Sequence, residues 1–228
     1  MSIELKQKGI IELKQKANFA IGMNRLTGIK AQVILVLDIS KSMSKLYRSG
    51  AVQNVIERIL GLALNFDDDG NIDMMLFGTN AYTLPPVTIN DFDGYVERVI
   101  LANHKVIEAT NYAPPLKLIL EKYRAHTGMP VFVIFLTDGG NSDKKETESV
   151  MRSLSSLPVF IQFVGIGAED FPFLKKLDEL QGRVLDNAGF MHIMDIENIS
   201  DSELYSRLLN EFPDWIKKAK DAKILNAV

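Results

Sequence analysis

Three short runs of apolar residues constrain the fold of this chain more than any other feature. They occupy residues 33–37, 131–136 and 159–164. A wholly apolar run of this length is typical of a strand that is buried on both faces of a sheet, whereas a half-exposed strand alternates apolar and polar residues. Strands of that kind occur in parallel sheets that carry helices on both sides. The chain is therefore predicted to be an α/β protein.

The segments between these runs carry helical periodicity or weaker strand patterns. Apolar residues recur every three to four positions over residues 52–63, and Pro114-Pro115 opens a second amphipathic segment. Further strands are predicted over 73–77, 81–84 and 190–195, and further helices over 92–101, 144–156, 171–181 and from Ser200 onward, before a break at Pro213. This order predicts a doubly wound, mostly parallel six-stranded sheet with helices on both faces and one short antiparallel edge strand.

Length, composition and charge fit one ordinary globular domain. The chain has 228 residues, of which 46% are hydrophobic and 24% charged, with a formal net charge of -3. That charge gives no overall positive field to attract nucleic acid. The chain has no cysteine, which excludes disulfides and thiolate metal sites and fits a reducing compartment. The apolar runs are too short to span a membrane, and the charged N-terminus lacks the apolar core of a signal peptide, so we expect a cytoplasmic protein.

The first 29 residues contain a duplicated hexapeptide. Ile-Glu-Leu-Lys-Gln-Lys occupies residues 3–8 and again 11–16, with a Gly-Ile pair between the copies. The alternation of apolar and polar residues around a glycine predicts a small β-hairpin or edge strands rather than an amphipathic helix. The predicted organisation is an N-terminal extension at 1–29, a main domain at 30–216 and a helical tail at 217–228.

Polar residues follow the predicted central strands. Asp38, Ser40 and Ser42 occupy alternate positions after the first strand, so an extended backbone directs their three side-chain oxygens the same way. Asp138 follows the strand at 131–136, and ligands of such sheets bind beyond the carboxyl ends of the strands. We therefore expect Asp38 and Asp138 to lie close together in space.

A divalent cation is the expected companion of these two carboxylates. Carboxylates side by side at a partly buried site repel each other, and one would tend to take up a proton if no cation were bound. The neighbouring donors are hard oxygens, without sulfur or imidazole. Such donors favour Mg²⁺, Mn²⁺ or Ca²⁺ over zinc or copper.

The motifs resemble the metal-ion-dependent adhesion site of von Willebrand factor A domains. The resemblance lies in Asp-x-Ser-x-Ser at 38–42, in the threonine of Ala-Thr-Asn-Tyr-Ala-Pro-Pro-Leu at 109–116, and in the aspartate of Leu-Thr-Asp-Gly at 136–139. It extends from about residue 30 to 215, and the predicted order of strands and helices agrees with it. The resemblance implies a Rossmann-like fold and a protein-binding module rather than an enzyme.

The same resemblance implies a role for each residue of the motif. Ser40 and Ser42 would bind the metal directly, and Thr110 would do so in the ligand-bound form. Asp38 and Asp138 would act largely through bound waters. One coordination position would stay open for an Asp or Glu of a protein partner.

A narrower resemblance connects the chain to bacterial proteins of the tellurium-resistance group, in its A-domain branch. It rests on Leu-Asp-Ile-Ser-Lys-Ser-Met at 37–43, on Thr-Asn-Tyr-Ala-Pro-Pro-Leu at 110–116 and on the leading hexapeptides, and it implies a stress-response complex. Lys41 departs from the small residue that is common between the two serines, and a cation there would either contact a partner carboxylate or weaken the affinity for the metal. We expect four residues around the metal to contact the partner: Lys41, Asn111, Tyr112 and Gly139.

Simpler interpretations exist for several of these features. Asp38 and Asp138 would each serve as a helix cap if no metal were bound. Residues 65–73 imitate an EF-hand calcium loop, but Leu76 stands where the bidentate Glu is required, which favours a solvated turn. The three histidines lack ligand spacing, and the lysines near the C-terminus read as a solvated helix face: His104, His126, His192, Lys217, Lys218, Lys220 and Lys223.

The alternative function is that of a Mg²⁺-dependent phosphohydrolase of the haloacid-dehalogenase kind, which also places an Asp after its first strand. That chemistry needs a second Asp two positions later as a general acid, and Ser40 stands there. No serine-hydrolase elbow, dinucleotide-binding glycine motif or phosphate-binding P-loop is present. We predict no catalytic residue and no nucleotide cofactor.

Overall fold

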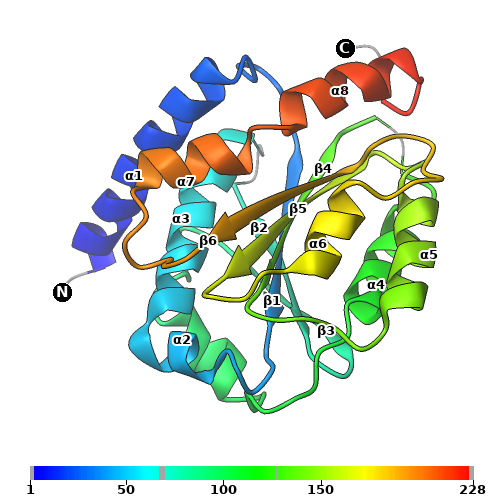
Figure 1. Ribbon diagram of the computed structural model, residues 1–228. Coiled ribbons are helices and arrows are strands. Elements are labelled where there is room, and N and C mark those ends of the chain that lie inside the picture. Colours follow the sequence, from blue (N-terminus) through cyan, green and yellow to red (C-terminus); the bar gives the residue numbers. More distant parts are fainter. Residues whose placement is uncertain (1–2, 67–69, 127, 226–228) are drawn as a thin grey trace.

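The computed structural model describes residues 3–66, 70–126 and 128–225. In this part of the chain, six strands form one sheet and helices cover both of its faces (Figure 1). The strands are β1 (Gln32–Asp38), β2 (Ile72–Phe77), β3 (Ala81–Val87), β4 (Val131–Thr137), β5 (Val159–Ile166) and β6 (Ala188–Ile193). The helices are α1 (Ile3–Met23), α2 (Ser44–Ser49), α3 (Ala51–Phe66), α4 (Ala113–Tyr123), α5 (Lys144–Leu154), α6 (Pro172–Asp178), α7 (Asp201–Leu208) and α8 (Phe212–Asp221), with a π-helical turn, η1 (Val96–Leu101).

The strands lie in the order β3-β2-β1-β4-β5-β6. All neighbours pair in parallel except β2 and β3, which are antiparallel. The predicted fold class is therefore confirmed, including the single antiparallel edge strand. Pro85 and Pro86 lie within β3, where the edge position tolerates the missing N–H donors.

Alternate residues of the central strands feed two separate cores. Val33, Leu35 and Leu37 of β1 pack into the core covered by α1, α3, α7 and α8. Ile34 and Val36 pack into the opposite core, covered by α4, α5 and α6. Figure 1 shows the same division of helices between the two faces. Because both faces of β1 are buried, the wholly apolar pattern of this strand follows directly from its place in the sheet.

The predicted hairpin in the first 29 residues is wrong, because Ile3–Met23 forms the helix α1. Ile10, Ala17 and Ile21 are buried along one side of α1, with helical spacing over the whole segment. This longer periodicity outweighs the two-residue alternation inside each hexapeptide. The helix packs against α3 and α7 (Figure 1).

A glycine permits the close approach of α1 to α3. A Cβ atom on Gly61 of α3 would lie 2.7 Å from the Cβ of Leu13 in α1. Asn65 Nδ2 also donates to the backbone oxygen of Lys14 at 3.0 Å. The N-terminal extension is thus packed into the same core as the rest of the domain.

The predicted boundary at residue 217 also needs correction. Helix α8 begins at Phe212, with Pro213 in its first turn as expected, and continues through the boundary to Asp221. Trp215 and Ala219 lie on either side of the boundary, and both are buried in the same core. Residues 217–225 therefore belong to the domain and are not a separate tail.

Two further expectations concern local features. The Ser200 cap is confirmed, since its Oγ accepts a hydrogen bond from the backbone N–H of Glu203 at 3.2 Å. The calcium-loop-like segment at 65–73 includes residues 67–69, which lie outside the described residues, and its last two residues already belong to β2, which begins at Ile72. Among the described helices, none is long and apolar enough to cross a membrane.

Candidate metal centre

The carboxylate of Asp38 is held in a fixed position at the carboxyl end of β1. Its Oδ1 accepts a hydrogen bond from the backbone N–H of Ser40 at 2.6 Å, and its Oδ2 accepts one from Oγ1 of Thr137 at 2.6 Å. Thr137 is the last residue of β4, the neighbouring parallel strand. Asp38 is fully buried. Both carboxylate oxygens are therefore positioned before any ligand binds.

A chain of hydrogen bonds joins this strand end to the next. Oγ of Ser40 lies 3.0 Å from Oγ of Ser42, and Oγ of Ser42 donates to Oδ1 of Asp138 at 2.7 Å. Ser40 is buried, whereas Ser42 is exposed and Asp138 is half-buried. The cluster therefore opens from a buried carboxylate at its base to an accessible hydroxyl and carboxylate at its rim. Four of the five predicted ligands come together in this way.

The two carboxylates of the cluster carry charge that the protein does not neutralise. Burial raises the pKa of Asp38 to about 6, against the hydrogen bonds from Thr137 and Ser40, and the charge of Asp138 adds to the rise. Burial also raises the pKa of Asp138, opposed by the hydrogen bond from Ser42. Within the described ranges, no ion pair reaches either carboxylate. A cation would remove this repulsion.

Thr110, the fifth predicted ligand, lies beside the cluster rather than in its hydrogen-bond chain. Its backbone oxygen accepts from the N–H of Ser142 at 3.0 Å, which ties it to the loop after Asp138. In the described part of the chain its hydroxyl makes no hydrogen bond to Asp38, Ser40, Ser42 or Asp138. The structure therefore holds the backbone of Thr110 next to the loop that follows Asp138, while its hydroxyl makes no described hydrogen bond to the other four predicted ligands.

The four residues expected to contact a partner are placed differently from one another. Lys41 is exposed, and Gly139 and Asn111 are partly exposed. Asn111 also connects its loop to the β2–β3 turn, because its Nδ2 donates to the backbone oxygen of Thr79 at 3.2 Å. Tyr112 is fully buried, which corrects the expectation that its side chain faces a partner.

Tyr112 instead supports the loop that follows Asp138 from within the core. Its hydroxyl donates to the backbone oxygen of Gly139 at 2.5 Å. Its ring packs edge-on against Phe77 and Phe135, with centroid distances of 5.8 and 5.1 Å. The residue fixes the loop that follows Asp138, so an aromatic residue beside the Thr110 position has a structural reason.

Sequence reasoning missed Asp143 as a residue that organises the site. Its two carboxylate oxygens accept from the backbone N–H groups of Tyr112 at 3.0 Å and Ala113 at 2.7 Å. Asp143 thereby caps the start of α4 from the loop between β4 and α5. No local pattern marks this role, since the capped helix begins 30 residues earlier in the chain.

Glu108 was missed for the same reason. Its carboxylate accepts from the N–H of Thr79 at 2.7 Å and from the hydroxyl of Tyr82 at 2.8 Å. Its backbone forms an isolated parallel bridge with Ser40. Glu108 therefore connects the loop that carries Thr110 to the serine loop and to the β2–β3 turn.

The donor set fits a hard divalent cation that keeps some of its waters. Among the described residues, no three His, Cys, Asp or Glu side chains come together to hold a metal. The cluster has two carboxylates and takes its other donors from hydroxyls, which suits Mg²⁺ better than zinc. The three histidines are engaged elsewhere: His104 packs on Tyr82, His126 bonds to Met129 and His192 bonds to Gly167.

Comparison with known proteins places this chain in a family. A family model described as the von Willebrand factor A domain found at the TerF C terminus matches residues 30–225. The chain belongs to the TerF-like von Willebrand factor A family. It is 46% identical over 220 residues to the uncharacterized protein YcbR of Bacillus subtilis (strain 168), covering 94% of this chain and 90% of that protein.

Solved structures of other proteins, one of them a VWA domain, show the same fold. The VWA domain of SpRpn10 has a TM-score of 0.57 at 14% identity, covering 80% of this chain and 95% of that one. Proximal thread matrix protein 1 from the mussel byssus has a TM-score of 0.55 at 20% identity, covering 82% of this chain and 48% of that one. Domains of this family are in general interaction modules. The comparisons therefore support a binding role, without indicating the metal or the partner.

Proposed function

We propose that this von Willebrand factor A domain binds a protein partner through a divalent cation held by Asp38, Ser40, Ser42, Thr110 and Asp138. The observation that carries the proposal is the continuous hydrogen-bond chain from Asp38 through both serines to Asp138. It joins two unneutralised carboxylates and two hydroxyls at the carboxyl ends of the central strands β1 and β4. Mg²⁺ suits this donor set best, and Mn²⁺ and Ca²⁺ share its preference for oxygen.

Each residue has a distinct task in the proposed site. In the proposed site the hydroxyls of Ser40 and Ser42 coordinate the metal directly, and Ser42 is the more exposed of the two. Asp38 supplies buried negative charge, held in place by Thr137. Asp138 supplies a second charge at the rim, and Thr110 coordinates the metal directly in the ligand-bound form. The bound cation acts as a Lewis acid toward an incoming carboxylate.

The proposed partner donates an Asp or Glu side chain to the remaining coordination position. Lys41 is exposed beside the serines and adds a positive charge that a partner carboxylate meets on approach. Asn111 and Gly139 complete the rim with polar contacts. This arrangement selects an acidic residue at the centre of the contact rather than a large apolar patch.

The proposed setting is a cytoplasmic stress-response complex of the tellurium-resistance type. The family model is the domain at the TerF C terminus, and the absence of cysteine fits a reducing compartment. We propose a binding and scaffolding role rather than catalysis. The phosphohydrolase alternative gains no support from the comparisons, and Ser40 replaces the general acid which that chemistry requires.

A displayed library of random peptides tests the proposal and requires no identified partner. Peptides are bound to the immobilised domain in Mg²⁺, eluted with a chelator and sequenced, in parallel for wild type and Ser42→Ala. The proposal predicts that wild type enriches peptides sharing an Asp or Glu, and that the variant does not. Enrichment that survives chelation, or that is equal for the variant, would contradict a metal-mediated contact.

A further inference from the structure

The outward face of α1 carries exposed apolar side chains. Phe19 and Met23 lie one turn apart and are 69% and 71% exposed. Of the nine large apolar side chains that are exposed in the described part of the chain, five belong to this helix: Ile3, Leu5, Ile11, Phe19 and Met23. Figure 1 shows α1 at the outside of the molecule, with α3 and α7 on its inner side. A surface helix ordinarily turns polar residues outward, so this concentration indicates a docking face.

Six residues of this face follow the spacing of a coiled-coil seam. Positions 5, 9, 12, 16, 19 and 23 are separated alternately by four and three residues, and Leu, Gly, Glu, Lys, Phe and Met occupy them in that order. Gly9 is half-buried and the other five are exposed. At about 1.5 Å per residue, this α1 seam is about 27 Å long. The helix therefore packs one side into the domain core and presents a second seam to solvent.

The apolar ends of the α1 seam match each other when two copies pair antiparallel. A two-fold axis at the middle of the seam places Leu5 opposite Met23 of the second copy, and Gly9 opposite Phe19. A Cβ on Gly9 would meet no atom within 4 Å, so nothing else in the described chain requires a glycine there. Glycine inside a helix weakens it. The ring of Phe19 from a second copy fits the open space above Gly9.

The centre of the α1 seam carries charges that fix its orientation. Antiparallel pairing places Glu12 opposite Lys16 of the second copy, and the two-fold axis makes this pair twice. Glu12 makes no ion pair within the described ranges. Lys16 pairs with Asp201 at 2.7 Å, but Arg58 also pairs with Asp201 at 2.9 Å, so Asp201 keeps a cation when Lys16 turns to a second copy. Parallel pairing would instead set Glu12 against Glu12, which repels.

The charges of this face do not suit an anionic membrane. The exposed charged residues of α1 are Glu4, Lys8, Glu12 and Lys16, so acidic and basic groups balance. Helices that lie in a membrane interface carry mainly Lys and Arg on their polar face. A balanced face suits a protein surface that carries the same two charges in reverse order.

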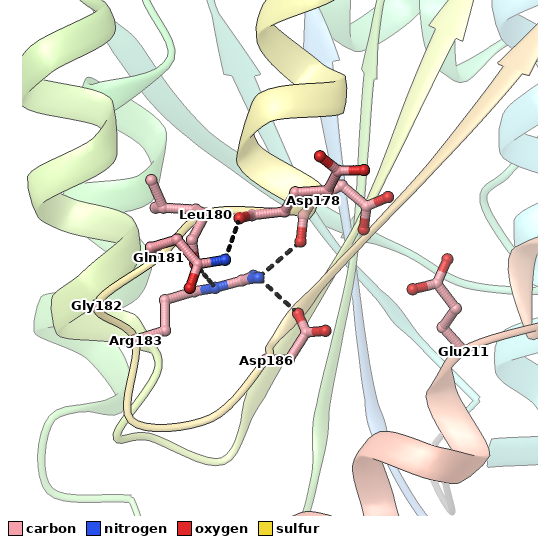
Figure 2. A pocket seen from close by; sticks show the side chains of 8 residues that line it. Asp178, Leu180, Gln181, Gly182, Arg183, Asp186 and Glu211 are labelled. Atoms are coloured by element: carbon pink, nitrogen blue, oxygen red, sulfur yellow. Dashed lines mark hydrogen bonds and ion pairs between the residues drawn. The ribbon is translucent and has the colours of Figure 1, made fainter.

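The charged cavity at the end of α6 offers no counterpart for these apolar residues. It has a volume of about 590 Å³, and Asp178, Arg183, Asp186 and Glu211 are among its lining residues (Figure 2). Nη2 of Arg183 pairs with Oδ1 of Asp186 at 2.8 Å. An apolar side chain such as Phe19 would displace water from these charges without replacing its hydrogen bonds. Among the described residues, most of the exposed large apolar side chains lie on α1 itself, which favours a second copy of this helix.

We propose that the chain forms a homodimer through antiparallel pairing of α1 with α1 of a second copy. Leu5, Phe19 and Met23 form its apolar contacts, and Glu12 and Lys16 set its register. The helix is already folded against its own domain, so pairing does not have to order it. The seam is short, and the dimer is therefore weak and depends on protein concentration. It does not depend on the metal centre, whose residues follow β1 and β4.

The first test follows the oligomeric state of the full chain by sedimentation velocity over a range of concentrations. Phe19→Ser removes the largest apolar contact. Val184→Ser is the matched control, since both side chains are 69% exposed and Val184 lies outside α1. We expect wild type and Val184→Ser to dimerise with a Kd of about 100 μM or tighter, and Phe19→Ser to dimerise at least roughly tenfold more weakly.

The second test measures the register. The chain has no cysteine, so a single introduced cysteine is the only thiol. Leu5→Cys and Met23→Cys are treated with a short bis-maleimide cross-linker, separately and as an equimolar mixture, at a concentration above the Kd. We expect the mixture to yield a cross-linked dimer, because the two positions lie opposite each other. Each variant alone should yield little, since its two cysteines are about 27 Å apart along the helices.

Three results overturn the proposal: a chain that stays monomeric at about 1 mM, equal dimerisation by the two serine variants, or preferential cross-linking of like cysteines. Vesicles of anionic lipid provide a fourth arm. Binding of monomeric wild type to them, lost in Phe19→Ser, would also overturn the proposal, because it assigns the outward face of α1 to a membrane.

Discussion

Oγ of Ser42 lies 2.7 Å from Oδ1 of Asp138, although 96 positions separate the two residues along the chain. The parallel pairing of β1 and β4, with Leu37 opposite Leu136, sets the two strand ends at the same level. The loops that follow then bring a hydroxyl and a carboxylate into contact. The candidate metal centre is thus a product of the sheet register, and each strand end contributes part of it.

Replacement of Asp143 by Ala is expected to destabilise the domain. The carboxylate of Asp143 accepts hydrogen bonds from the first backbone N–H groups of α4. Its removal leaves these two donors unsatisfied. We expect the free energy of unfolding in urea to fall by about 1–2 kcal/mol. Asp221→Ala, at the exposed end of α8, is the matched control and should change it little. Equal effects of the two variants would show that Asp143 is not a cap.

Replacement of Gly61 by Ala tests the packing of α1 on α3. The added Cβ would lie 2.7 Å from the Cβ of Leu13 and 3.0 Å from its carbonyl carbon, so the helices must separate. We expect a loss of about 1–3 kcal/mol in the free energy of unfolding. Gly22→Ala in α1 is the control, because no atom lies within 4 Å of its added Cβ. That variant should be neutral or stabilise by up to about 1 kcal/mol, and a similar loss in both would refute the close crossing.

Replacement of Glu211 by Gln is expected to stabilise the protein at neutral and higher pH only. The folded-state pKa of Glu211 is about 7, above its usual value of 4.5. A carboxyl group with a raised folded pKa favours the folded state at low pH, and this contribution disappears as pH rises through about 7. Wild type and variant should therefore be equally stable near pH 4, whereas the variant should gain about 1 kcal/mol near pH 8.

The measurement is urea unfolding of both proteins across that range, in phosphate buffer without organic cations. Glu211 faces Asp178, Asp186, Arg183 and Lys218, so the stability difference between variant and wild type reports on this group of charges. A difference that does not change with pH would contradict a raised pKa at Glu211.

The sequence predicts well the central strands and the clustering of Asp38, Ser40, Ser42 and Asp138, whereas metal binding by that cluster stays a prediction. Each depends on residues close together in the chain: wholly apolar runs for β1, β4 and β5, and alternate oxygens after Asp38. Sheet topology then brings the predicted strand ends together without any further local signal. The cap at Ser200 was equally predictable, since its partner Glu203 is three residues away.

The features that sequence reasoning missed depend on distant partners. The hexapeptides favoured strands, but α1 is stabilised by packing on α3, where Gly61 makes room for Leu13. Tyr112 reads as a polar aromatic next to the motif, yet burial against Phe77 gives it a supporting role. Asp143 organises a helix that precedes it by 30 residues. None of these contacts leaves a periodic or spaced pattern in the sequence.

The most direct test of the central claim is calorimetric titration of Mg²⁺ into the metal-stripped protein. Wild type is compared with Ser42→Ala and with Ser153→Ala, whose hydroxyl bonds only within the exposed face of α5. We expect one Mg²⁺ per chain for wild type and Ser153→Ala, and an affinity at least roughly tenfold weaker for Ser42→Ala. Absence of Mg²⁺ binding by wild type, or equal affinity in all three proteins, would contradict a metal centre at the end of β1 and β4.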